Sequence, residues 1–334
     1  MKNKVVELPL SEPILTAYNY QGIDGALIYN NPSIRNRYIN DLIMVYCNTK
    51  FLSGYTTPEF KVQSSSFVFN PYIESHEMKM KFFNGYTNRI IHQILDSGYY
   101  VACWGIDDYY VDGKSWFRER HFIHDILIYG YDDESKTFSV LAYDKSWKFA
   151  PFKTPQKSFE KGRRSAFKQN KFGCIWALKP VEETVEIDPK KIHDSISKYL
   201  YHVFNEENPA RNDFIWGIDS YIYLGMYMDK LIDGSIPYER MDRRIFRLLW
   251  EYEKLMLERI IKLEDMFEFS GEFSEDYKKI VKYADDIRML YASYHIRRRD
   301  SILPKIKEIL DKLYREERVL LKAFNYRLGD KLEL

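Results

Sequence analysis

Two histidines stand three residues apart in the stretch HFIHDILIYGYDD, residues 121–133. His124 opens an apolar run with the character of a strand, which Gly130 and an acidic turn bring to an end. The chain then returns as FSVLAYD, residues 138–144, which ends at Asp144. Because the start of one strand in a hairpin lies beside the end of the next, the sequence predicts that His124 and Asp144 are neighbours.

A histidine and a carboxylate in contact could perform acid–base chemistry. The carboxylate accepts from one ring nitrogen and fixes the tautomer, and the other nitrogen is then free to act as a base. Asp144 would thus orient His124 within a nucleophile–base–orienter arrangement. Structural interpretations remain open, since a histidine at a strand end is often a packed residue and an aspartate before lysine is often a turn residue.

His121 is the alternative ring for this chemistry. A metal site is not expected, because three-residue spacing on a strand puts the rings of His121 and His124 on opposite faces. The helical metal-binding pattern HExxH is also absent. We therefore expect neither a metal nor a bound cofactor.

Short apolar runs in the first half of the chain supply the elements that would position these residues. The segment 86–98 has apolar residues at helical spacing, with Thr87 as a candidate N-cap and Gly98 as a candidate terminator. Four runs rich in β-branched and aromatic residues predict strands, at 99–106, 124–132, 138–144 and 172–180.

The second half of the chain has a different periodicity. After a linker at 181–191, apolar residues recur at intervals of three and four, with charged residues on the other faces. Helices are predicted at 192–204, 246–267, 277–299 and 304–324. The expected fold class is α+β: a domain over residues 1–182 with an antiparallel sheet, followed by an all-α helical domain over residues 190–334.

The composition excludes several classes of protein. The 334 residues carry a net charge of +1, which gives no general attraction to nucleic acid or to a membrane surface. The three cysteines are too few and too far apart for a disulfide framework. No apolar run is long enough for a membrane span or a signal peptide, so we expect a cytoplasmic protein.

The stretch from Asp107 to Asp144, DDYYVDGKSWFRERHFIHDILIYGYDDESKTFSVLAYD, resembles the N-terminal domain of the butirosin biosynthesis protein H family. The shared pattern is a strand that ends in acidic-Tyr-Tyr, then a histidine, an apolar strand, Gly-Tyr-Asp, a hairpin and a strand that ends in aspartate. Leader peptidases of the papain-like superfamily are similar in the histidine and the Gly-Tyr-Asp strand. The resemblance covers residues 85–180 well and residues 1–60 poorly.

This resemblance implies a papain-like fold with a Cys, His, Asp triad in which His124 is the base and Asp144 orients it. It also implies an enzyme of antibiotic or other secondary metabolism that takes an acyl group from a carrier-protein thioester and passes it to a small-molecule amine. The partner would be an acyl or peptidyl carrier protein, which brings the phosphopantetheine arm. The nucleophile would stand at the start of the first helix, close to a glutamine that holds the oxyanion.

The chain departs from the family pattern at the nucleophile. The segment TAYNYQGIDGALIYNN, residues 16–31, contains the glutamine, Gln21, but neither cysteine nor serine. Asp24 stands near the expected place and is a poor nucleophile for amide synthesis. Cys47, in the apolar run 42–49, is the remaining cysteine that could serve, since Cys103 and Cys174 lie within predicted strands.

Four interpretations of function follow. His124 could deprotonate an amine that attacks the thioester directly, without a covalent intermediate. Cys47 could instead be a nucleophile in an arrangement that the sequence does not reveal. The fold could also have lost catalysis and act as a binding or assembly partner of a carrier protein. A peptidase is the weakest option, because amide hydrolysis depends most on a strong nucleophile.

Overall fold

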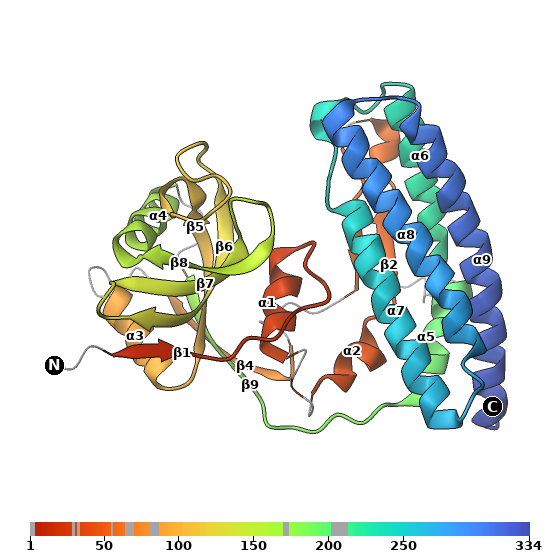
Figure 1. The fold of residues 1–334 in the computed structure, drawn as a ribbon, viewed down its shortest axis with the longest axis horizontal. Coiled ribbons are helices and arrows are strands. Elements are labelled where there is room, and N and C mark those ends of the chain that lie inside the picture. Colours follow the sequence, from red (N-terminus) through yellow and green to blue (C-terminus); the bar gives the residue numbers. More distant parts are fainter. Residues whose placement is uncertain are drawn as a thin grey trace. The chain divides into compact units, whose positions relative to one another are not determined.

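The computed structural model describes residues 4–28, 31, 34–54, 56–63, 70–79, 87–169, 174–201 and 213–334. The chain forms two compact units, which we describe separately. The first unit comprises residues 1–34 and 65–184, and the second comprises residues 35–64 and 185–334. An antiparallel sheet dominates the first unit and long helices dominate the second, as the predicted fold class requires (Figure 1).

The sheet of the first unit has seven strands among the described residues, in the order β4-β9-β5-β6-β7-β8 with β1 paired to β6. Every neighbouring pair is antiparallel. The strands are β1 (Val5–Glu7), β4 (Ile73–Lys79), β5 (Tyr100–Asp107), β6 (Ile123–Asp132), β7 (Thr137–Tyr143), β8 (Phe149–Pro155) and β9 (Cys174–Pro180).

Three helices accompany this sheet: α1 (Asn19–Ile28), α3 (Thr87–Asp96) and α4 (Gln156–Lys168). Ile91 of α3 and Phe159 of α4 share one buried cluster with Ile126 and Ile128 of β6. Side chains of a strand alternate between its faces, so these two residues of β6 point to the same side. The central strand is thereby buried, and its N-terminal end at Ile123 and His124 is left partly exposed.

The predicted helix at 86–98 corresponds to α3, and its residue 86 lies outside the described residues. Gly98 ends the helix as predicted, with φ of 79°. The N–H of Tyr99 donates to the carbonyl of Ile94, and that of Gly98 donates to Leu95. This left-handed turn suits glycine because a side chain there would be strained.

The second unit contains helices α2 (Asn36–Asp41), α5 (Pro189–Tyr201), α6 (Ser220–Ile232), α7 (Ile245–Phe267), α8 (Glu272–Arg297) and α9 (Ile302–Lys331). It also holds a small antiparallel sheet of β10 (Phe214–Trp216), β2 (Val45–Asn48) and β3 (Phe60–Val62). Short 3₁₀ turns occur across both units, at Lys50–Ser53, Asp108–Tyr110, Gly217–Asp219 and Tyr238–Arg240. Of the predicted helix at 192–204, residues 202–204 lie outside the described part of the chain.

The unit boundaries differ from the predicted domains in one respect. The sequence predicts that residues 1–182 form one domain, whereas residues 35–64 group with the helices of the second unit. The fully buried Arg259 of α7 explains this, because its guanidinium donates to the carbonyls of Tyr38, Ile39 and Leu42 at the end of α2. A helix C-terminus carries partial negative charge, so a buried cation stabilises it.

Candidate functional site

The end of β5 carries two fully buried carboxylates, those of Asp107 and Asp108. The β5–β6 register shifts between Cys103 and Ile106, and such a bulge turns the end of a strand. After it, Ile106 lies opposite His124 on β6. The two aspartates are thus brought to the N-terminal end of β6, where the two histidines lie.

Asp108, rather than Asp144, orients His124. The Nδ1 atom of His124 lies 2.8 Å from Oδ2 of Asp108. Asp144 instead accepts from the backbone N–H groups of Ser146 and Lys148, as a turn residue does. The predicted pairing of His124 with Asp144 is therefore wrong.

The physical reason lies in the β6–β7 ladder. Its register from Leu127–Leu141, if continued, would bring Asp144 opposite His124, as the hairpin argument assumes. The paired residues stop at Leu127–Leu141, however, and Asp144 forms an isolated bridge with Lys114. The two strands of the hairpin have separated before they reach the histidine.

Lys114 completes the arrangement, because its ammonium nitrogen lies 3.2 Å from Oδ1 of Asp108 and both side chains are fully buried. The buried carboxylate thus lies between a cation and an imidazole. Burial raises the pKa of the nearby Asp125 carboxyl above its ordinary value. The sequence analysis missed Asp108 and Lys114, although the acidic pair before Tyr-Tyr stood in the stretch that carries the resemblance.

Asp108 holds the ring of His124 through one nitrogen only, and the second nitrogen has no described hydrogen-bond partner. The side chain of His124 is 25 % exposed, and the ring of Phe122 contacts it edge-on with centroids 4.3 Å apart. Its Nδ1 is occupied by Asp108, whereas Nε2 has no hydrogen-bond partner among the described residues. An imidazole held by a carboxylate at Nδ1 with Nε2 free is the arrangement of a general base.

His121 belongs to a second carboxylate. Its Nδ1 lies 2.8 Å from Oδ2 of Asp107, and the same oxygen accepts from the hydroxyl of Ser165 at 2.6 Å. Gly162 allows α4 to approach so closely, since a Cβ there would lie 2.9 Å from the Asp107 carbonyl oxygen. The hydroxyl proton of Ser165 goes to the carboxylate and not to a histidine, so this group is not a serine triad.

The start of α1 lies beside the candidate base. The side-chain amide of Asn19, the first residue of α1, donates to the carbonyl of Asp125 at 3.4 Å, and its Oδ1 is buried without a partner. The resemblance implies a nucleophile at this helix start, and asparagine cannot serve as one. Gln21 lies in the same turn and is 3 % exposed, with both amide atoms buried and unpaired.

Cys47 does not fit the role of a nucleophile. It lies on β2 in the second unit, fully buried, and its thiol donates to the carbonyl of Asn48. Burial raises its pKa well above the ordinary range of a thiol, so the reactive thiolate is suppressed. The prediction of Cys47 as a nucleophile is corrected on this ground, and Cys103, whose pKa burial raises to about 12, is equally inert.

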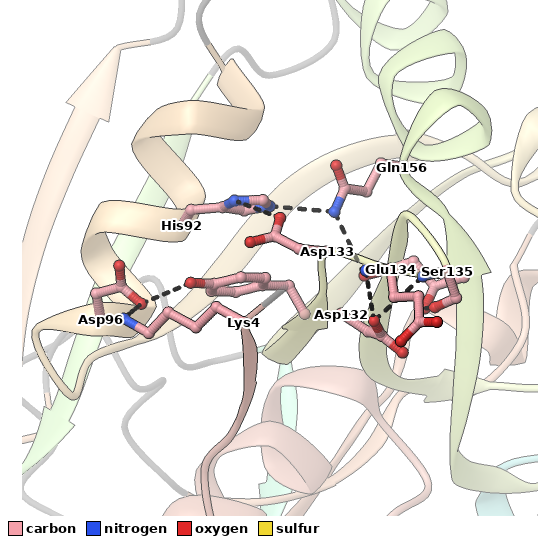
Figure 2. Close-up of polar contacts among 10 residues, drawn as sticks. Lys4, His92, Asp96, Asp132, Asp133, Glu134, Ser135 and Gln156 are labelled. Atoms are coloured by element: carbon pink, nitrogen blue, oxygen red, sulfur yellow. Dashed lines mark hydrogen bonds and ion pairs between the residues drawn. The ribbon is translucent and has the colours of Figure 1, made fainter. Parts of the chain in front are cut away.

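A further histidine, His92 of α3, lies near the other end of β6. Figure 2 shows its ring between Gln156 and Asp133, with Lys4 and Asp96 nearby. Its Nε2 lies 3.1 Å from the amide of Gln156, and its Nδ1 lies 3.8 Å from Asp133. The ring stacks on Tyr131 at 3.8 Å, and burial lowers its pKa. Protein groups therefore surround both nitrogens, which is typical of a structural histidine.

Within the described part of the chain, no group of three His, Cys, Asp or Glu side chains could hold a metal ion. No described helix is long and apolar enough to cross a membrane. Comparison with the models of known protein families gave no match, and comparison with curated proteins gave none either.

Proposed function

We propose that this chain transfers an acyl or aminoacyl group from a carrier-protein thioester to an amine. His124 is the general base in this proposal, and Asp108 takes the orienting role that the sequence analysis gave to Asp144. The observation that carries it is the pairing of His124 Nδ1 with a fully buried, lysine-paired Asp108, while Nε2 has no hydrogen-bond partner in the part of the chain that the structure describes.

The reaction can proceed without a covalent intermediate. The amine nitrogen attacks the thioester carbonyl, the C–S bond breaks, and the products are an amide and a thiol. Nε2 of His124 accepts the proton that the amine loses and returns it to the leaving sulfur. A thioester is an activated acyl donor, so positioning and general-base catalysis supply the rate enhancement.

The absence of a nucleophile at the start of α1 favours this direct route over a triad mechanism. Asn19 is the first residue of α1, and its side-chain amide donates to the backbone carbonyl of Asp125. Asp125 directly follows the candidate base, His124, in sequence.

The same observation supports a second candidate function. A papain-like domain with asparagine at the helix start could bind a carrier protein without catalysis, as an assembly partner. This alternative keeps the partner and removes the reaction, so only an activity measurement separates the two.

The deciding experiment incubates the full chain with a thioester analogue and an amine and measures amide formation. We expect His124→Ala to lower the rate by about 10²- to 10⁴-fold, which is the usual contribution of a general base. Cys47→Ala should retain full activity. Equal product yields from the wild type and from His124→Ala would refute the enzymatic function.

A further inference from the structure

A continuous strip of aromatic rings leads to His124 from the protein surface. The exposed ring of Trp147 meets Trp116 edge-on at 4.9 Å, and Trp116 lies 6.4 Å from Phe122. Phe122 in turn contacts His124 at 4.3 Å. These four residues form what we call the aromatic strip, and its inner end is the candidate base.

Cationic side chains lie over the aromatic strip and over Phe117, which follows Trp116 in sequence. The guanidinium of Arg120 lies 5.6 Å from the ring centre of Trp116 and 5.7 Å from that of Phe122. The guanidinium of Arg118 and the ammonium of Lys145 lie over Phe117, at 5.0 and 5.1 Å. Aromatic faces hold such cations in place without neutralising them.

Arg118 and Arg120 have no anionic partner in the described part of the chain. Lys145 pairs with Asp112 at 2.9 Å, whereas neither Arg118 nor Arg120 makes an ion pair with a carboxylate among the described residues. Glu119, which separates them in sequence, is exposed and pairs with neither. Arg118 and Arg120 lie in the segment that leads into β6 and the candidate base, and two guanidiniums without a described carboxylate partner indicate a site for an anion there.

The backbone also holds this surface in an uncommon conformation. Arg118 and Trp147 both have φ of 59°, in the left-handed region that residues other than glycine rarely adopt. The structure around them must therefore fix the backbone conformation at both positions.

We propose that the aromatic strip binds the phosphorylated pantetheine arm of the thioester donor. Arg118 and Arg120 take the phosphate, since guanidinium groups match phosphate oxygens in geometry and charge. The uncharged arm lies along Trp116 and Phe122, and the thioester reaches His124. This inference rests on the proposed function and names the group that the site recognises in its donor.

Binding can be measured without catalysis. Calorimetric titration of the full chain would compare 4′-phosphopantetheine with pantetheine, which lacks the phosphate. We expect the phosphorylated compound to bind about tenfold more tightly or better, because charged hydrogen bonds depend on it. The double variant R118Q/R120Q should remove this difference, and added salt should weaken it.

Lys153→Gln is the matched control. Lys153 is an exposed cation on β8 whose register partner is Ser139, toward the Asp132 end of the sheet and away from His124. The substitution removes one positive charge from the same unit and should leave the tenfold preference for 4′-phosphopantetheine over pantetheine intact. If this control and R118Q/R120Q lost the preference for the phosphorylated compound to a similar extent, net charge and not the aromatic strip would attract the phosphate.

Two natural sources present the same arm, coenzyme A and a carrier protein. Tighter binding of coenzyme A than of 4′-phosphopantetheine would assign the donor as a free coenzyme A thioester, with its adenine on Trp147. Equal binding would assign the arm of a carrier protein, and either result supports the site.

The inference and the proposed function fail in different ways. Equal affinity of the wild type for pantetheine and 4′-phosphopantetheine would overturn the inference, even if amide formation were observed. A phosphate preference that R118Q/R120Q abolishes, in a protein that forms no amide, would uphold the inference and refute the reaction. His124→Ala should keep the preference in both cases, because it leaves both arginines in place.

Discussion

At the scale of single residues, the proposed function rests on Asp108 and on Lys114, whose ammonium group offsets the charge of the Asp108 carboxylate. Two neighbouring aspartates each bind one histidine, and only Asp108 has a buried cation on its other oxygen. Removal of one member of a buried ion pair leaves the other uncompensated, which destabilises a protein strongly. The orientation of His124 and the stability of the site are therefore linked.

We expect Asp108→Asn to reduce thioester aminolysis by about 10²- to 10⁴-fold, since the amide cannot support the protonated imidazole. The measurement is the rate of amide formation as a function of thioester concentration. The double variant D108N/K114M should recover stability in thermal unfolding, because no buried charge remains unpaired, but not activity.

Asp144→Asn is the matched control, because Asp144 is the residue that the hairpin argument paired with His124. It lies at the turn between β7 and β8, where its carboxylate accepts from two backbone N–H groups. It should keep nearly full activity at a cost in stability of about 1 kcal/mol. A loss of activity that matches Asp108→Asn would restore Asp144 as the orienting residue.

At the scale of elements, the predicted helices and strands are present and the strand limits agree closely, whereas α8 begins at Glu272 rather than at 277 and α9 continues to Lys331 rather than to 324. Strand and helix periods are local properties, so β5, β6, β7 and the long helices could be predicted from pattern alone. The first-unit strands β1, β4 and β8 were not predicted. β4 and β8 have mixed exposure in the sheet, and neither forms a continuous apolar run.

The attachment of α2 to α7 is an element-scale feature that no local pattern reveals. Arg259→Met should destabilise the second unit by about 3 kcal/mol or more, because three carbonyls lose charged hydrogen bonds at once. Urea unfolding of the full chain is the measurement. Lys262→Met, on the exposed side of α7, is the control and should change the free energy of unfolding by less than about 0.5 kcal/mol.

At the scale of the whole molecule, Glu253 and Glu317 of the second unit are fully buried carboxylic groups with no described cation paired to them. Glu253 of α7 accepts from Tyr221 and Tyr277, both at 2.6 Å. Glu317 of α9 accepts from Tyr199 at 2.9 Å and Tyr277 at 3.0 Å. All five side chains are almost fully buried, so helices α5 to α9 each contribute to one polar cluster.

This cluster makes stability depend on pH. Burial raises the pKa of Glu253 to about 7, and burial together with the charge of Glu253 raises that of Glu317 further. The folded state then holds protons that the unfolded state releases above about pH 4.5. Folding takes up protons in that range, so the free energy of unfolding falls as pH rises from about 4.5 towards 7.

The expected slope is about 1.4 kcal/mol per pH unit for each proton taken up. Urea unfolding across this pH range is the measurement. Glu317→Gln introduces a side chain that is neutral at every pH, so the free energy of unfolding of this variant should depend less steeply on pH. Glu308→Gln removes an exposed carboxylate from the same helix and should leave the slope unchanged. A wild-type stability that rises with pH over this range, with no change in Glu317→Gln, would contradict the buried acid pair.

The sequence by itself determined the fold class and the main elements, because periodicity and turn residues act over a few positions. Only the tertiary structure decided which carboxylate meets His124, that asparagine occupies the helix start, and that residues 35–64 pack with the helices. Each of these depends on where the pairing of two strands ends or on which buried groups form hydrogen bonds and ion pairs with each other. Such contacts join segments that lie far apart in the sequence.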